Sequence, residues 1–542
     1  MDDRSFRKLP KFFHYRSVSS LTGVIASLVV IGECSHSAEA GSFSAAVESI
    51  QEKQLRKHVE VLASDTFEGR EAGSRGGRAA GVYLVERLKK LGVRPAGVDR
   101  SFYQEFGNGY RNVLAMFPGR DPRLKDEVIL LCAHYDHVGY GTRQNSLGAI
   151  GYIHNGADDN GSGTAGLLEI VEAFAKLERR PSRTILFAFW DAEEKGLLGS
   201  RHWIRRPTVP LGHLKLAINI DMIGRMRENR VIVVGSRSAV GWRRIVAEQN
   251  GEAKLHLEFP WTLKRNSDHY PFIENGIPAI MLHTGKHEDY HRPSDDSHKV
   301  KYKAMQRVGR LVFRLAHRLA NEKSLPAYRA ASLREDDDDR SRLLSPLPPL
   351  PTRFGVSWSS GENKSGPLKI GGVLPGSPAE VAGLKIGDRI ESFDDVPING
   401  SAMFHGLVMK AFNPVSVEVL RGKENRRVTL QVKLNGHPRR VGISWGEDPA
   451  EPGTVILRRV ITGSPAALAG LKNGDRILAV QDHRFKTAEQ FREMISQTRN
   501  GMKITFERHG QIQTVTLKFS GNARSTASPI RAEKPRRASL TR

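Results

Sequence analysis

Ile153-His-Asn-Gly-Ala-Asp-Asp-Asn-Gly-Ser-Gly163 joins two parts of the chain that have the composition of buried strands. The stretch places two adjacent carboxylates among Gly, Asn and Ser, residue types that favour turns. Before it, a strand-like segment ends at His134 and Asp136, and after it a second one leads to Glu193 and Glu194. This grouping of imidazoles and carboxylates around one polar loop indicates a metal site.

The segments around this loop predict an α/β fold, because short apolar runs alternate with helical patterns. The apolar runs span 128–133, 184–190, 216–220 and 279–282, and the longest helical patterns span 164–177 and 300–319. Such alternation is typical of a mixed, largely parallel sheet flanked by helices. Ligands of open α/β sheets bind beyond the carboxyl ends of the strands. We therefore expect the polar residues that follow the runs to converge there.

The length and charge of the chain limit the possible classes of protein. Its 542 residues exceed one hydrophobic core and favour three or four domains. The formal net charge is +24 at pH 7. The basic residues are scattered, without helix-turn-helix or zinc-finger spacing, so nucleic acid is not an expected partner.

The first forty residues have the composition of an export signal. Basic residues precede an apolar run at 21–31, and Ala38-Glu-Ala40 fits the pattern of a cleavage site. We expect a periplasmic or extracellular protein without stable membrane insertion after cleavage, although retention of the signal as an anchor stays open. Cleavage would leave Cys132 alone, so no disulfide is expected.

An internal repeat follows the α/β region. Gly376-Ser-Pro-Ala-Glu-Val-Ala-Gly-Leu-Lys-Ile-Gly-Asp-Arg-Ile390 recurs as Gly463-Ser-Pro-Ala-Ala-Leu-Ala-Gly-Leu-Lys-Asn-Gly-Asp-Arg-Ile477, an offset of 87 residues. This offset fits a small domain that occurs twice. Before the repeat, an acidic cluster at 335–339 and Pro346-Leu-Pro-Pro-Leu-Pro351 predict a solvated, semi-rigid linker.

These features divide the chain into six predicted segments. They are a signal peptide at 1–40, an α/β domain at 41–324, a linker at 325–351, repeated modules at 352–435 and 439–520, and a disordered basic tail at 521–542.

Five motifs in the α/β region carry a family resemblance. They are His134-Tyr-Asp136, Gly156-Ala-Asp-Asp-Asn160, Asp191-Ala-Glu-Glu-Lys-Gly196, Asn219-Ile-Asp-Met222 and Tyr290-His-Arg-Pro-Ser-Asp295. In this order they resemble the zinc-dependent exopeptidase family that contains the bacterial secreted leucyl-type aminopeptidases, the glutamate carboxypeptidases and the glutaminyl cyclases. The resemblance covers about residues 50–322 and implies the zinc exopeptidase fold with two zinc ions.

The resemblance also implies roles for individual residues. Asp158 would bridge the two zinc ions, and the full ligand set would be His134, Asp158, Glu194, Asp221 and His291. Glu193 would be the general base, and Asp136 would orient His134.

Other residues near these motifs receive weaker predictions. The resemblance places Asp268 and Tyr290 on the substrate side of the site. For His137, His154 and His283, we expect local hydrogen bonds.

The repeated module resembles the PDZ domains of bacterial proteases. In such domains a loop offers backbone amides to a peptide carboxylate while the peptide adds to a sheet edge. The corresponding loops here are Phe354-Gly355-Val356 and Val441-Gly442-Ile443. Asp388 and Asp475, in the repeated signature, are expected to stabilise turns.

The expected function is an exported di-zinc aminopeptidase whose PDZ modules bind peptides or protein C-termini, or regulate access. A glutaminyl cyclase or carboxypeptidase of the same family, and an inactive peptide-binding scaffold, stay open as alternatives. The sequence leaves open the preferred N-terminal residue, the filling of both zinc sites, the orientation of the modules and the oligomeric state.

Overall fold

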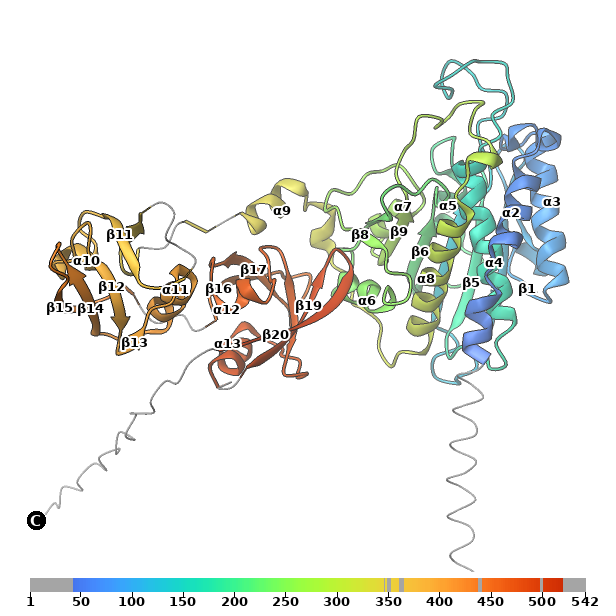
Figure 1. Cartoon of the computed structure of the whole chain (residues 1–542). Coiled ribbons are helices and arrows are strands. Elements are labelled where there is room, and N and C mark those ends of the chain that lie inside the picture. Colours follow the sequence, from blue (N-terminus) through green and yellow to red (C-terminus); the bar gives the residue numbers. More distant parts are fainter. Residues whose placement is uncertain are drawn as a thin grey trace, which may run out of the picture. The chain divides into compact units, whose positions relative to one another are not determined.

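The computed structural model describes residues 42–345, 347–348, 352–359, 365–436, 441–497 and 501–519 (Figure 1). The chain divides into two units, Met1–Asp337 with His509–Gln511, and Asp338–Arg508 with Ile512–Arg542. The predicted signal at 1–40 and tail at 521–542 lie outside the described residues. Within the described part of the chain, no helix combines the length and apolarity needed to cross a membrane.

A nine-stranded sheet forms the centre of the first unit, in the order β1-β3-β5-β4-β6-β9-β7-β8, with β2 paired to β3. The strands are β1 (Arg94–Pro95), β2 (Tyr103–Phe106), β3 (Tyr110–Phe117), β4 (Val128–His134), β5 (Thr184–Trp190), β6 (Leu214–Ile220), β7 (Arg230–Val234), β8 (His256–Glu258) and β9 (Ala279–His283). The central pairs β5–β4, β4–β6 and β6–β9 are parallel, whereas β3–β5 and β7–β9 are antiparallel. The predicted mixed, largely parallel sheet is confirmed.

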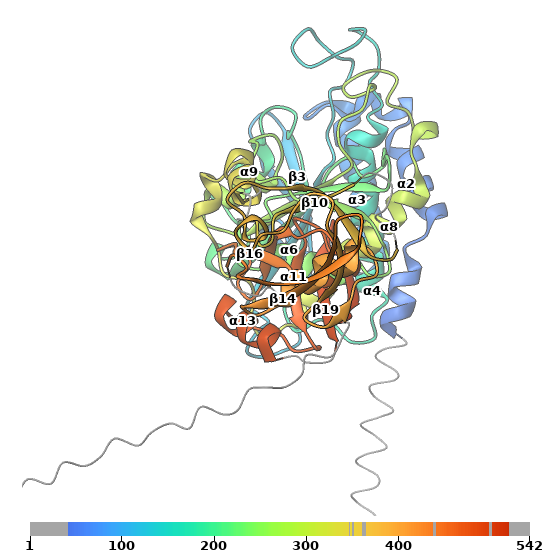
Figure 2. The same ribbon diagram turned by 60° about the vertical axis from the view of Figure 1, so that its left-hand side comes forward.

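Helices cover both faces of this sheet (Figures 1 and 2). They are α2 (Glu52–Leu62), α3 (Arg75–Lys90), α4 (Gly163–Ala175), α5 (Leu198–Arg205), α6 (Trp242–Gln249), α7 (His269–Glu274) and α8 (Tyr302–Asn321). Alternate residues of β4 enter different cores: Ile129 and Leu131 pack with α2, α4 and α8, while Leu130 and Cys132 pack with α5 and α7. Burial on both faces explains why the central strands read as continuous apolar runs.

The carboxyl ends of the central strands lie at one edge of the sheet. His134 at the end of β4 pairs in register with Trp190 at the end of β5, and β6 runs parallel to β4. Side chains that follow these three strands are therefore brought together.

The boundary predicted at 324/325 is corrected, because residues 325–337 pack on the first unit. The Tyr328 hydroxyl donates to the Ile273 carbonyl at 2.8 Å. Glu335, predicted to be a solvated linker residue, accepts hydrogen bonds from Arg237 at 2.6 Å and from Arg329 at 2.7 Å. Pairing with these two guanidinium groups explains why part of the acidic cluster is ordered. The helix α9 (Asp337–Leu344) follows.

Two antiparallel modules make up the second unit, with strand orders β10-β11-β12-β14-β15 and β16-β17-β18-β19-β20. The first contains β10 (Val356–Trp358), β11 (Leu368–Val373), α10 (Pro378–Val381), β12 (Arg389–Phe393), β13 (Val396–Pro397), α11 (Ser401–Lys410), β14 (Val415–Arg421) and β15 (Arg426–Val432). The second contains β16 (Ile443–Glu447), β17 (Val455–Val460), α12 (Pro465–Leu468), β18 (Arg476–Val480), α13 (Ala488–Gln497), β19 (Met502–Arg508) and β20 (Gln511–Leu517). Each module has a separate apolar core.

The repeated signature has the same structure in both modules. Ser377 and Ser464 cap the short helices α10 and α12, each of which begins with Pro. Asp388 Oδ2 accepts the Lys385 amide at 2.9 Å, and Asp475 makes the equivalent bond at 2.7 Å. The turn role predicted for both aspartates is confirmed. Each aspartate also accepts two hydrogen bonds from an arginine that sequence analysis did not assign, Arg421 or Arg508.

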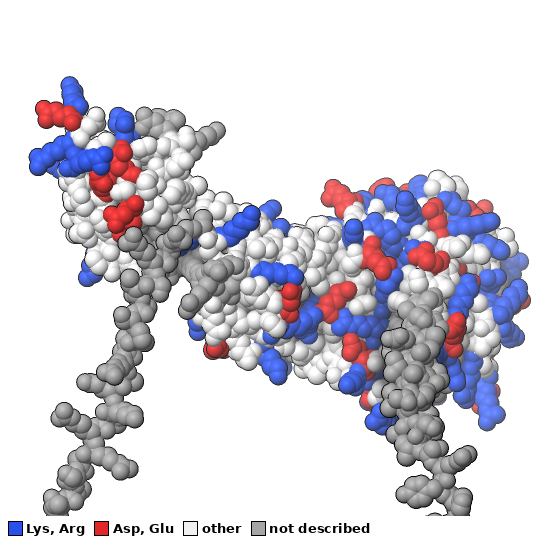
Figure 3. Space-filling model, turned by 60° about the horizontal axis from the view of Figure 1, so that its bottom comes forward, with Lys and Arg blue, Asp and Glu red and all other residues white. Residues whose placement is uncertain are grey.

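The surface charges are mixed on the face drawn in Figure 3, where Lys and Arg side chains alternate with Asp and Glu.

Candidate metal and catalytic site

Two groups of potential ligand atoms meet beyond the carboxyl ends of β4, β5 and β6. The first group is His134, Asp159 and Asp221, and the second is His137, Asp159, Glu194 and His291. Within each group the ligand atoms lie within 4.8 Å of one another. The structure thus brings together four of the five predicted ligands.

Asp159 is common to both groups, and its two oxygens face different partners. Its Oδ1 lies 3.5 Å from His134 Nε2, and its Oδ2 lies 3.1 Å from His291 Nε2. His134 Nε2 is also 3.5 Å from Asp221 Oδ1, and His291 Nε2 is 3.1 Å from Glu194 Oε2. One carboxylate placed between two such groups is the arrangement of a bridging ligand.

The prediction for Asp158 is corrected in this respect: Asp159, and not Asp158, lies between the two ligand groups. The Asp158 Oδ1 accepts the Gly224 amide at 2.6 Å and the Ser162 hydroxyl at 2.8 Å. Its Oδ2 lies 3.2 Å from His287 Nε2. Because the backbone turns at this point, the two adjacent carboxylates diverge, and Asp158 becomes part of the support of the loop.

The donor set fits zinc. His134 Nδ1 lies 3.2 Å from the Asp136 carbonyl oxygen, and His291 Nδ1 lies 2.9 Å from that of Asn145. Each Nδ1 can therefore carry the proton and leave an Nε2 lone pair for a cation. His291 Nε2 and Asp221 Oδ1 are buried without a hydrogen-bond partner among the described residues. Two imidazoles with three carboxylates suit zinc, which accepts nitrogen and oxygen ligands.

The electrostatics of the site also favour a cation. Burial lowers the pKa of His291, but the carboxylates of Asp159 and Glu194 more than offset this effect and raise it to about 10. An environment that stabilises imidazolium so strongly carries excess negative charge, which a divalent cation would neutralise.

Glu193 is held through its backbone rather than its side chain. The Asp136 carboxylate accepts the Glu193 amide at 3.1 Å and the Glu194 amide at 3.3 Å. Burial raises the pKa of the Glu193 carboxyl well above its ordinary value. Asp136, predicted to orient His134, lies closer to that imidazole through its carbonyl oxygen, at 3.2 Å, than through its carboxylate, at 3.7 Å.

Arg70 is a residue of the site that sequence analysis missed. Its side chain is fully buried and donates to the carbonyl oxygens of Leu62, Tyr135, Asn155, Gly156 and Asp159, at 2.6, 2.9, 2.7, 2.9 and 3.5 Å. Burial lowers the pKa of Arg70 to about 10, which leaves the guanidinium charged at neutral pH. No sequence signal distinguishes Arg70 from the surface arginines beside it.

Asp295 holds the same loop from the other side. Its Oδ2 accepts the Asp158 amide at 2.9 Å and the Asp159 amide at 3.1 Å. Its carbonyl accepts the Ala157 amide at 2.9 Å. The peptide bond between Asp159 and Asn160 is cis. The loop at 153–163 is thus held at successive residues by the buried guanidinium group of Arg70 and by the buried carboxylate of Asp295.

Comparison with known proteins places this site in a family. Residues 112–316 match the model of peptidase family M28, and residues 353–434 and 456–507 match PDZ domain models. The α/β unit belongs to peptidase family M28. The predicted zinc exopeptidase family and the two PDZ domains are confirmed.

Two curated relatives and one solved structure illustrate the likeness of the M28 unit. Leupeptin-inactivating enzyme 1 of Streptomyces exfoliatus is 26% identical over 242 residues, 44% of this chain and 50% of the relative. Aminopeptidase YwaD of Bacillus subtilis is 30% identical over 214 residues, 37% of this chain and 43% of the relative. The LapA aminopeptidase structure of Legionella pneumophila shares 19% identity and a TM-score of 0.43, covering 53% of this chain and 76% of that one. This chain spans about half the length of the curated relatives.

The M28 unit places both predicted substrate-side residues near the ligand groups. The Tyr290 ring stacks on that of His291 with centroids 3.9 Å apart. Burial and nearby carboxylates, first that of Asp159, raise the pKa of Tyr290. Asp268 is buried, accepts the Ser200 hydroxyl at 2.5 Å, and has a pKa raised to about 7 chiefly by burial.

The three histidines expected to make local hydrogen bonds differ in their contacts. His154 lies 2.9 Å from the Tyr152 carbonyl and 2.8 Å from the Ser146 hydroxyl, and His283 accepts the Gly285 amide at 3.2 Å. These are the local bonds expected. His137 also makes one, since its Nδ1 lies 2.9 Å from Glu194 Oε1, but the structure adds it to the second ligand group.

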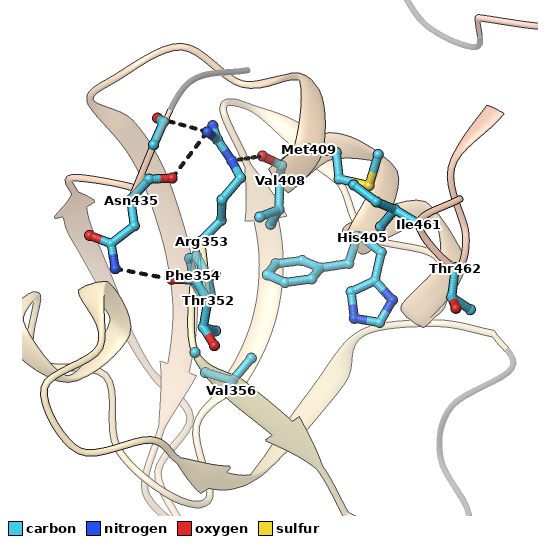
Figure 4. Close-up of a pocket in the computed structure, with 13 residues that line it drawn as sticks. Thr352, Arg353, Phe354, Val356, His405, Val408, Met409, Asn435, Ile461 and Thr462 are labelled. Carbon is cyan, nitrogen blue, oxygen red and sulfur yellow. Dashed lines mark hydrogen bonds between the residues drawn. The ribbon is translucent and has the colours of Figure 1, made fainter. Parts of the chain in front are cut away.

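A second site lies in the first PDZ module. The predicted loop Phe354-Gly355-Val356 lines a cavity of about 410 Å³ together with Phe404 and Val408 of α11 (Figure 4). The corresponding loop of the second module, Val441-Gly442-Ile443, is contacted by Met409, whose Cε would lie 3.0 Å from a Cβ at Gly442. The two predicted peptide loops therefore have different surroundings.

Proposed function

We propose that the protein is an exported di-zinc aminopeptidase that removes N-terminal residues from peptides and binds peptide C-termini through its PDZ pair. The observation that carries the enzymatic part is the position of Asp159, whose two oxygens face two separate groups of imidazole and carboxylate ligands.

In this proposal Asp159 would contribute to both zinc sites. His134 and Asp221 would complete one site, and Glu194 and His291 would complete the other. When bound, the two ions supply Lewis-acid polarisation of the scissile carbonyl and a water that ionises near neutral pH.

Glu193 moves the proton during hydrolysis. Its carboxylate accepts a proton from the attacking water and returns it to the leaving amine. The amide contact with Asp136 fixes the position of Glu193.

Asp268 supports a substrate with a free amino group. Its carboxylate lies outside both ligand groups and raises the pKa of Glu193, so the two side chains lie within electrostatic range of each other. An acidic group that no metal neutralises would stabilise the α-ammonium of a substrate N-terminus and repel the α-carboxylate that a carboxypeptidase binds.

The test is product analysis of the purified chain on one peptide sequence in three forms: free, Nα-acetylated, and with N-terminal Gln. We expect stepwise release from the free N-terminus and no cleavage of the acetylated form, and both reactions should stop with a chelator. Release from the C-terminus, or conversion of N-terminal Gln to pyroglutamate without cleavage, would instead identify one of the family alternatives. Fewer than about one zinc per chain without activity would indicate a scaffold.

Export is proposed from the composition of residues 1–40. Expression of the full chain in a bacterial host, followed by mass measurement of periplasmic protein, tests it. A mature chain that begins at Gly41 is expected, and full-length protein confined to the cytoplasm would contradict export.

A further inference from the structure

The cavity of the first PDZ module has a wall that comes from the second module. Besides the loop at 352–356 and helix α11, Ile461 and Thr462 line it, and these residues follow β17 of the second module (Figure 4). The equivalent of Ile461 in the first module, by the 87-residue offset, is Leu374, which is 51% exposed. One position of the repeat is therefore used for contact in one module and left free in the other.

Further contacts between the modules involve the same helix. A Cβ at Gly463 would lie 3.7 Å from His405 Cβ, and a Cβ at Gly442 would lie 3.0 Å from Met409 Cε. Helix α11 therefore lies against both the 461–463 turn and the predicted carboxylate loop of the second module. Met409 lies close to that loop and also lines the cavity of the first module.

The lining of the cavity defines the chemistry of an occupant. Its apolar side chains are Phe354, Val356, Phe404, Val408, Met409 and Ile461. Arg353 is the one Lys or Arg among the lining residues, none of which is acidic. Its guanidinium donates to the Val408 carbonyl at 3.0 Å and to the Gly436 carbonyl at 2.8 Å, which fixes a positive charge at the cavity. Burial lowers the pKa of His405 and so disfavours its charged form.

We propose that the two PDZ modules form one composite peptide site. The groove of the first module binds a free C-terminal carboxylate with a large apolar last side chain, and Ile461 and Thr462 of the second module form part of its specificity wall. The proposal rests on the proposed peptide binding by the PDZ pair and adds that neither module alone carries the whole site.

The charge and shape of the cavity support this ligand over the alternatives. A terminal carboxylate complements the Arg353 charge, and an apolar last side chain fills a cavity whose side chains are mostly apolar. A last residue with an acidic side chain would place a second, unpaired anion against Phe354 and Phe404, at a cost of desolvation.

The test uses the full chain and ten-residue peptides labelled at the N-terminus with a fluorophore, which also blocks the aminopeptidase reaction. The peptides end in Phe, Leu or Asp, and a fourth ends in Phe amide. Fluorescence anisotropy should show binding of the Phe and Leu peptides and at least about tenfold weaker binding of the Asp and amide peptides. Equal affinity for the acid and the amide would overturn the proposed ligand.

Two matched substitutions separate the composite site from a site in one module. Ile461→Asp should weaken binding of the Phe peptide at least about tenfold, whereas Leu374→Asp, at the same position of the repeat, should change it less than about twofold. Ile461→Ala is a milder change that should weaken binding about threefold. It gives a result even if the Asp variant misfolds. Equal affinities of the wild-type, Ile461→Asp and Ile461→Ala chains would overturn the composite site.

A third variant makes failure of the two proposals distinguishable. Phe404→Ala removes an aromatic side chain that belongs to the first module alone. If it abolishes binding while the Ile461 variants do not, peptide binding by the PDZ pair stands and the composite site fails. If the wild-type chain binds none of the four peptides, both fail.

Discussion

The metal site of the M28 unit and the groove of the PDZ pair differ in the polarity of the side chains that form them. The metal site consists of buried charged groups, some of which are fixed by several hydrogen bonds, as Arg70 and Asp136 are. The groove consists of apolar side chains around an open cavity. Removing one partner from a buried polar network leaves another polar group desolvated and without a hydrogen bond. Shortening an apolar side chain of the groove lowers the free energy of binding only in proportion to the apolar area that is lost. Substitutions should therefore act sharply in the first region and gradually in the second.

The largest effect is expected for Glu193→Gln. The amide keeps the shape of the side chain and the backbone contact with Asp136, but it does not accept a proton. We expect kcat on an aminoacyl substrate to fall at least about 1000-fold while the zinc content is unchanged. Steady-state kinetics with metal analysis of the same sample provide the measurement, and a loss smaller than about tenfold would exclude Glu193 as the base.

A pair of variants in adjacent residues tests the bridge. Asp159→Asn should weaken zinc binding by at least about 100-fold, because it changes the carboxylate shared by both ligand groups. Asp158→Asn, whose carboxylate is bonded to Gly224 and Ser162, should weaken it less than about tenfold. Competition with a chromophoric chelator measures both affinities. Equal losses of zinc affinity would contradict the assignment of Asp159, rather than Asp158, as the shared ligand.

Arg70→Met tests how strongly the stability of the protein and its zinc affinity depend on the buried hydrogen bonds of Arg70. The substitution leaves five carbonyl oxygens without their donor. We therefore expect the free energy of unfolding, measured by urea denaturation, to fall by about 3–5 kcal/mol. Zinc affinity should also fall about tenfold or more, since the loop of Asp159 loses its support. Arg75→Met, in the same segment but with a side chain 83% exposed, is the control and should change stability by less than about 0.5 kcal/mol.

Arg70→Lys refines this result, because lysine keeps the charge but not the fork of donors. Partial recovery of zinc affinity relative to Arg70→Met is expected. If Arg70→Met lowers stability but leaves zinc affinity unchanged, the residue supports the fold and not the metal site.

The smallest effect is expected in the groove. Val408→Ala trims the wall of the cavity and should weaken binding of a peptide ending in Phe by about three- to tenfold, without change in hydrolysis of a short free peptide. Ile495→Ala, the same position of the repeat in the second module, should leave peptide affinity within about twofold. An effect of Ile495→Ala as large as that of Val408→Ala would show that both modules accept the peptide.

Sequence patterns predicted the fold better than they predicted the fine structure of the site. The run at 184–190 coincides with β5, because a strand buried on both faces has an unambiguous apolar composition. Asp158 and Asp159 share one motif, and only the backbone turn decides which faces the ligands. Arg70 was missed because its partners are carbonyl oxygens, which every residue has. The boundary was placed before 325 because acidic residues predict a solvated linker unless arginines such as Arg237 and Arg329 lie nearby.

Cys132, which is buried in β4, is a chemical probe of how often the central sheet opens. Its thiol lies 3.5 Å from Asn219 Oδ1, and burial raises its pKa well above the ordinary value. Alkylating reagents attack an exposed thiolate, so they can reach this sulfur only when the central sheet opens. In a chain that begins after residue 40, Cys132 is the one remaining cysteine. Its labelling rate would therefore report opening of the M28 sheet by itself, without interference from the PDZ pair.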